Sequence, residues 1–137
     1  MYLNLKTYWM RKAIQQLLER KSLYLAFGIT FAIGYLSLTK LTIGSFGLPA
    51  SFSDKILHIV AYAVLSFFWF LTIDRKNWAK RYFSVAFVAL LLYGVLLEYL
   101  QMKLTTYRFG NFLDIVANTT GVVFAAVFCK LVYFRYP

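Results

Sequence analysis

The chain has 137 residues, of which 61% are hydrophobic, 20% are aromatic and only 15% are charged. Soluble globular domains are about 45–50% apolar and roughly a quarter charged, so this composition excludes an ordinary soluble domain and indicates an integral membrane protein. The net charge of +10 would suggest nucleic acid in a soluble protein, but most basic residues here flank apolar runs, where they set topology and meet lipid headgroups, and we expect no nucleic-acid partner.

The first twenty residues mix apolar side chains with basic ones. Leu3 and Trp9, for example, alternate with Lys6 and Arg11. This basic amphipathic composition is typical of a helix that lies at the membrane interface. We therefore expect residues 1–20 to form an interfacial helix that leads into the first span, with a partner-docking arm as the alternative.

Four apolar runs follow, and each approaches the roughly 20 residues that a helix needs to cross the hydrocarbon core. They cover residues 22–39, 56–73, 82–102 and 112–134. The first run is too long for the apolar part of a cleavable signal peptide and lacks a clear small-residue cleavage site. The connections are short, and neither a repeat nor a linker is visible. The sequence therefore predicts one domain, residues 1–137, folded as an all-α bundle of four transmembrane helices.

The basic residues predict the orientation of this bundle. They concentrate before the first run, between the second and third, and around the end of the fourth: Lys6, Arg11, Lys12, Arg20, Lys21, Arg75, Lys76, Lys80, Arg81, Lys130 and Arg135. With four spans, these three segments lie on one side of the membrane. Because cytoplasmic segments carry the excess of Lys and Arg, we expect both termini to be cytoplasmic.

Polar residues interrupt the second and third runs near their extracytoplasmic ends. Asp54, His58 and Tyr62 recur at intervals of four residues and so follow one helix face. Glu98 and Gln101 are three residues apart and share a face of the third run. Ionisable groups are costly in a bilayer and commonly mark a function. His58 and Glu98, which lie inside apolar runs, are the strongest candidates.

The fourth run begins with a similar polar set. Asp114 and Asn118 share a face that continues through Gly121, and Arg108 lies in the connection just before. Since the spans alternate in direction and a helix rises about 1.5 Å per residue, seven of these residues fall at one level: Asp54, His58, Glu98, Gln101, Arg108, Asp114 and Asn118. We interpret them as a polar pocket open to the extracytoplasmic leaflet.

Each residue also has a structural interpretation. An acid at a helix start, such as Asp54 or Asp114, is favoured by the helix dipole. Asn118 can hydrogen-bond a neighbouring helix, and Lys55 can extend to the headgroups. Gln101 and Tyr62 are compatible with interface and packing roles.

The same residues resemble the VanZ-like membrane proteins. The matching blocks are "DKILHIVAYAVL" from Asp54, "YGVLLEYLQ" from Tyr93 and "YRFGNFLDIVANTTG" from Tyr107, in the order and spacing of that family. The positions that fall on its motifs are Asp54, Lys55, His58, Tyr62, Gly94, Glu98, Gln101, Arg108, Asp114, Asn118 and Gly121. The resemblance implies a four-helix envelope protein of the bacterial cytoplasmic membrane. The family takes its name from a member linked to teicoplanin resistance, so antibiotic resistance is one expectation.

Our first functional hypothesis is a non-catalytic binder of a membrane lipid or lipid-linked envelope precursor. Arg108 and Lys55 would contact a phosphate, and the other polar groups would bond hydroxyls or amides. The predicted ligand-binding residues are Asp54, Lys55, His58, Tyr62, Glu98, Gln101, Arg108, Asp114 and Asn118.

Three other classes remain open. In an enzyme, His58 would be the acid or base, oriented by Glu98 or Asp114, with Arg108 stabilising negative charge; no G-x-S-x-G nucleophile motif accompanies them. In a scaffold, the same charges would pair to fix the helix order. A proton-coupled transporter of four spans would need an oligomer, and the oligomeric state does not follow from the sequence.

A metal needs about three protein ligands. Asp54, His58, Glu98 and Asp114 supply suitable groups, but neither H-E-x-x-H nor a second histidine is present. We therefore expect no metal and no cofactor.

Overall fold

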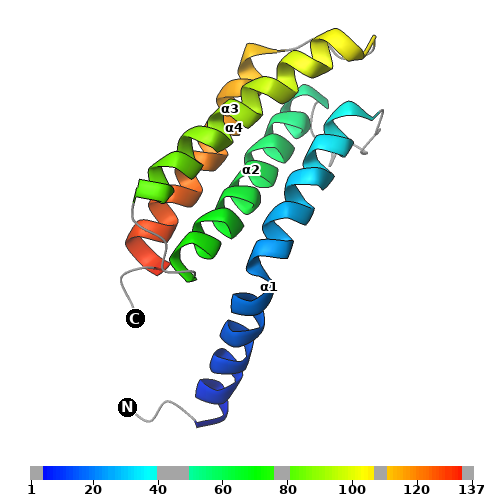
Figure 1. Cartoon of the computed structure of the whole chain (residues 1–137). Coiled ribbons are helices and arrows are strands. Elements are labelled where there is room, and N and C mark those ends of the chain that lie inside the picture. The colour runs from blue at the N-terminus through cyan, green and yellow to red at the C-terminus, as the bar shows by residue number, and fades with distance from the viewer. Residues whose placement is uncertain (1–4, 40–49, 76–80, 107–110, 134–137) are drawn as a thin grey trace.

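The computed structural model describes the backbone of residues 5–39, 50–75, 81–106 and 111–133, and the side chains of residues 21–39, 53–74, 81–106 and 111–131. Within these ranges the regular structure is entirely helical: α1 (Leu5–Leu38), α2 (Ala50–Arg75), α3 (Arg81–Leu104) and α4 (Phe112–Phe128), which continues as a π-helical turn, η1 (Cys129–Tyr133). The helices run alternately in opposite directions, side by side (Figure 1).

Four helical segments are long and apolar enough to cross a membrane. They are Lys21–Leu38, Ser53–Asp74, Arg81–Leu104 and Phe112–Leu131, and they agree within a few residues with the four predicted spans. The prediction of an all-α bundle with four spans is therefore confirmed, and the chain is a multi-pass membrane protein.

The N-terminal segment forms no separate helix. Residues 5–20 belong to α1, a single element of 34 residues, which at about 1.5 Å per residue is about 50 Å long. The hydrocarbon core is only about 30 Å thick. The blue N-terminal half of α1 accordingly projects beyond the ends of the other helices (Figure 1). The predicted interfacial helix is thus a continuous extension of the first span.

The surface of the bundle is as apolar as its interior. Large apolar side chains such as Phe31, Leu92 and Phe124 are exposed. In water this would be unfavourable, but hydrocarbon solvates such side chains. What distinguishes the interior is small and polar residues, as expected where helices associate in lipid.

Helices α2 and α4 form the most extensive contact of the bundle. Their backbones touch at Gly121, because a Cβ there would overlap the carbonyl oxygen of Ile59 and lie 2.9 Å from the backbone nitrogen of Ala63. A residue without a side chain therefore permits this close crossing. Gly121 is therefore the point of closest packing between α2 and α4 that the glycine contacts show.

Helix α3 contributes side chains to the apolar core that α2 and α4 form. Its Leu90 joins the buried side chains of Tyr62, Leu65 and Phe70 of α2. The Phe83 ring stacks on Phe70, with ring centroids 4.2 Å apart.

Helix α1 is attached to α2 and α3 by hydrogen bonds near mid-span. Trp69 Nε1 donates to Thr30 Oγ1 over 3.1 Å, and the Tyr93 hydroxyl donates to the Thr30 carbonyl oxygen over 2.6 Å. Gly34 leaves room for this hydroxyl, which lies 2.8 Å from where a Cβ would be. These three residues lie on three different helices, so no spacing in the sequence predicts their pairing.

We expect Gly121→Ala to destabilise the protein by about 1–3 kcal/mol, the usual cost of overpacking, because the new methyl group meets backbone atoms that cannot move aside. The free energy of unfolding in lipid bicelles measures this. Gly28→Ala is the matched control, since nothing lies within 4 Å of a Cβ at Gly28, and it should be neutral or slightly stabilising. Equal stability of both variants would contradict a direct α2–α4 backbone contact.

Candidate functional site

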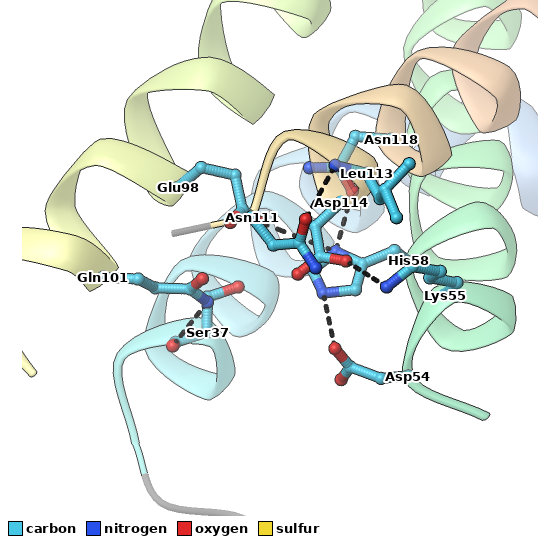
Figure 2. A network of polar contacts seen from close by, with 10 residues as sticks. All are labelled: Ser37, Asp54, Lys55, His58, Glu98, Gln101, Asn111, Leu113, Asp114 and Asn118. Carbon is cyan, nitrogen blue, oxygen red and sulfur yellow. Dashed lines mark hydrogen bonds and ion pairs between the residues drawn. The ribbon is translucent and has the colours of Figure 1, made fainter. Parts of the chain in front are cut away.

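The polar residues of three helices meet near one end of the bundle (Figure 2). Lys55 and His58 come from the first turns of α2, and Asp114 and Asn118 from the first turns of α4. Glu98 approaches from the last turns of α3. The predicted common level of these residues thus corresponds to spatial proximity.

The start of α4 is held by Asn111, its N-cap residue. The Asn111 side-chain oxygen accepts a hydrogen bond from the Leu113 backbone nitrogen over 3.0 Å, and such caps satisfy donors that a helix start leaves unpaired. The cap sets where α4 begins, and therefore places Asp114 in its first turn, facing α2. Sequence reasoning missed Asn111, although Asn three residues before an acid at the start of an apolar run is a recognisable cap signal.

Two short contacts join α2 to α4. Lys55 Nζ lies 3.1 Å from Asp114 Oδ1, forming a charged hydrogen bond. His58 Nδ1 lies 2.8 Å from Asn118 Oδ1. An amide oxygen only accepts, so Nδ1 carries the proton and Nε2 of the neutral ring presents a lone pair.

Two carboxylates flank the His58 ring at longer distances. Asp54 Oδ2 lies 3.8 Å from His58 Nε2, and Glu98 Oε1 lies 3.9 Å from His58 Nδ1. Both separations exceed hydrogen-bond length. The ring is therefore oriented by Asn118, and the carboxylates act on it through space.

Among the charged and amide side chains around His58, the outermost are the most exposed. The side chains of Asp54 and Lys55 are 30% and 25% exposed, and those of His58 and Asp114 are each 11% exposed. Glu98 and Asn118 are only 4% and 3% exposed. The outer members of this group therefore reach its surroundings, whereas the inner ones are buried.

Acidic groups outnumber basic ones among the described residues of the site. Asp54, Glu98 and Asp114 supply three carboxylates, against the single ammonium group of Lys55. That ammonium already bonds Asp114. Arg108, the predicted anion contact, lies outside the described residues. The described part of the site thus favours cationic or hydrogen-bond-donating groups.

Gln101 and Tyr62 lie at the edges of the site, Gln101 nearer the helix ends and Tyr62 one turn deeper than His58. Gln101 Nε2 donates to the Ser37 carbonyl oxygen over 2.8 Å. This hydrogen bond joins α3 to the end of α1, at the same end of the bundle as His58 (Figure 2). Tyr62 is buried where α3 crosses closely, since a Cβ at Gly94 would lie 3.3 Å from Tyr62 Cε1 and 3.3 Å from Asn118 Cβ. The small size of Gly94 therefore allows α3 to approach α2 and α4 closely.

The floor of the site holds polar atoms whose hydrogen-bonding capacity is unused. The Asn118 amide nitrogen and the Tyr62 hydroxyl are buried, with no hydrogen-bond partner among the described residues. An unsatisfied buried polar group costs about 1–3 kcal/mol. A ligand that reaches this depth therefore gains from bonding to them.

Comparison with known proteins gives one match. A family model described as VanZ/LLP1 matches residues 4–133, which include every predicted site residue. No curated protein and no solved structure matches the chain.

We expect Lys55 and Asp114 to be energetically coupled. In a double-mutant cycle of Lys55→Gln and Asp114→Asn, the coupling energy should be about 0.5–3 kcal/mol, as for other groups in direct contact. The readout is the free energy of unfolding in bicelles. Lys55→Gln combined with Asp74→Asn is the control, because Asp74 is exposed at the opposite end of α2; those changes should add within about 0.3–0.5 kcal/mol. Additivity in both cycles would mean that the 3.1 Å contact contributes nothing.

Proposed function

The chain belongs to the VanZ/LLP1 family, and we propose that it is a non-catalytic binder whose polar site holds the headgroup of a membrane lipid or lipid-linked envelope precursor. The observation that carries the proposal is the gradient of exposure, from Asp54 and Lys55 at the helix ends to the buried Asn118. Amphiphile headgroups lie in the interfacial region that borders the hydrocarbon core, next to the helix ends that carry Asp54 and Lys55.

The balance of charge supports a particular kind of headgroup. Carboxylates of Glu98 and Asp114 accept hydrogen bonds, so they suit sugar hydroxyls, amides or an ammonium group. The phosphate that links a headgroup to its lipid would contact Lys55 at the open edge, and Arg108 in the connection before α4. A headgroup rich in donors is therefore favoured over a bare phosphate.

An apolar pocket of about 350 Å³ supports the binding of the lipid chain. It lies between α1, α2 and α3, and its lining residues include Thr30, Trp69, Ile73, Val85 and Tyr93. Its volume is within the range of small-molecule pockets, about 300–1,000 Å³. Trp69 is eleven residues beyond His58 on α2, which corresponds to about 16 Å. An acyl or polyprenyl chain that descends from the headgroup along the bundle spans this distance.

The alternative is a membrane-embedded enzyme with His58 as acid or base. Binding is the better supported of the two, because the partner of His58 at hydrogen-bond distance is the Asn118 amide at 2.8 Å. Glu98, the proposed orienting acid, lies 3.9 Å from the ring nitrogen. A catalytic imidazole is usually oriented by a hydrogen-bonded third group that stabilises its charged form, and a neutral amide does this poorly.

We also propose that the site faces the extracytoplasmic side of the bacterial cytoplasmic membrane, with both termini in the cytoplasm. The distribution of basic residues supports this orientation. A cysteine at the exposed Thr106 should then react with an impermeant thiol reagent added to intact cells, whereas a cysteine at Asp74 should react only after permeabilisation. The single native cysteine, Cys129, is buried and should give little background. The opposite labelling pattern would place the site at the cytoplasmic leaflet.

Native mass spectrometry of the purified protein tests the binding proposal. The wild type should retain a lipid or lipid-linked molecule, and Lys55→Gln and Glu98→Gln should each bind it about tenfold more weakly, equivalent to about 1.4 kcal/mol. A charged hydrogen bond is typically worth about 1.5–3 kcal/mol.

Asp74→Asn, which removes a carboxylate at the other end of α2, is the control and should retain the lipid. A wild type that is always free of lipid would overturn the proposal. Conversion of the added lipid-linked molecule would favour the enzyme instead. The identity of the retained molecule also tests the link to teicoplanin resistance. We propose this link only if the molecule is a cell-wall precursor.

A further inference from the structure

We propose that Asp54, His58 and Asp114 form a binding site for a divalent metal ion of the zinc type. Each residue offers one ligand atom, and the three atoms lie within 4.8 Å of one another. Two ligands about 2.1 Å from a tetrahedral ion are about 3.4 Å apart. His58 Nε2 and Asp54 Oδ2 are 3.8 Å apart, so small side-chain adjustments bring both into coordination range.

The orientation of His58 independently supports a metal. Metal-ligating histidines almost always donate their second ring N–H to a carbonyl or carboxylate, which fixes the ring and its tautomer. His58 Nδ1 donates in this way to Asn118 Oδ1 over 2.8 Å, with Glu98 Oε1 a further neighbour at 3.9 Å. The lone pair of Nε2 is consequently directed to the side of the ring on which Asp54 lies.

The carboxylates of the site attract cations. Asp54 and Glu98 lie on either side of the His58 ring, and Asp114 lies in the first turn of α4. A divalent ion held between Asp54, His58 and Asp114 would gain from this negative charge. The Lys55 ammonium at 3.1 Å from Asp114 Oδ1 competes with the metal for this carboxylate, and its partly exposed side chain can turn outward.

The ligand set selects the class of ion. Calcium and magnesium prefer oxygen ligands alone, whereas zinc accepts one imidazole nitrogen with two carboxylate oxygens. Three protein ligands leave a fourth position open, and the exposure of Asp54 directs this position toward the end of the bundle. The sequence contains no second histidine, which argued against a metal. In the structure Asp114 of α4 supplies the third ligand atom instead. The inference is independent of the proposed headgroup binding.

The test is titration of the purified, tag-free and chelator-treated protein with Zn²⁺ alone, and with Co²⁺ as a spectroscopic probe. One ion should bind per chain, and Co²⁺ should give the visible absorption of a four-coordinate site. His58→Asn and Asp114→Asn should each weaken Zn²⁺ binding by more than the 10–100-fold that loss of a supporting residue costs, and Asn118→Ala by about 10–100-fold.

Two further variants make the result specific. Asp74→Asn should leave Zn²⁺ affinity unchanged, because Asp74 lies at the opposite end of α2. Lys55→Gln should bind Zn²⁺ more tightly, because a competing positive charge is removed, whereas the same change should weaken binding of a lipid phosphate. Elution volume and helical circular dichroism check the folding of each variant, and Asp54→Asn, at the least buried of the three positions, serves where His58→Asn or Asp114→Asn fails to fold.

The proposal is overturned if the wild type binds no stoichiometric Zn²⁺, or if binding survives the loss of His58 or Asp114 unchanged. The lipid-retention experiment on chelator-treated protein is read separately, so failure of either proposal leaves the other distinguishable.

Discussion

The structure depends on the backbone contact between α2 and α4 at Gly121. Ile59, whose carbonyl oxygen would overlap a Cβ there, directly follows His58, and Asn118 lies three residues before Gly121. The same crossing that lacks room for a methyl group therefore brings His58 within 2.8 Å of Asn118. One turn nearer the helix ends, it brings Lys55 to Asp114. In lipid, where no hydrophobic force drives helices together, such close packing is the main source of helix association.

The polar site lies at one end of the bundle, beside the close crossing of α2 and α4. Its groups lie where two helices begin and a third ends, so the outermost side chains reach water while the innermost are buried. This gradient lowers the cost of the carboxylates relative to a location at mid-span. It also means that a ligand enters from the end of the bundle and meets Asn118 last. The Asn118 amide nitrogen and the Tyr62 hydroxyl, which have no hydrogen-bond partner among the described residues, would gain partners from a bound ligand.

Helix α1 contributes differently from the other three. It combines apolar packing, in which Ile29 and Ile33 lie against the core, with hydrogen bonds. Thr30 accepts bonds from Trp69 and Tyr93 near mid-span, and Ser37 accepts one from Gln101 at the site end. The apolar pocket lies beside Thr30, between α1, α2 and α3.

The four spans and the common level of the polar residues follow from the sequence alone. Run length and hydropathy determined the four spans, their alternating direction placed Asp54, His58, Glu98, Asp114 and Asn118 at one level, and the spacing of four between Asp114 and Asn118 placed both on one face. These are local or one-dimensional properties, since a helix has a constant rise and a constant rotation per residue. The motif resemblance correctly indicated the family.

Only the tertiary structure decided which side chains pair. Asp114 bonds Lys55. The hydrogen-bond partner of His58 is the amide oxygen of Asn118 and not a carboxylate. Gln101 turns to α1. Which of several residues at the same depth form a contact depends on how neighbouring helices are rotated and how far apart they lie. Those quantities depend on contacts between residues far apart in the chain, such as Gly121 with Ile59, and no spacing within a single helix records them.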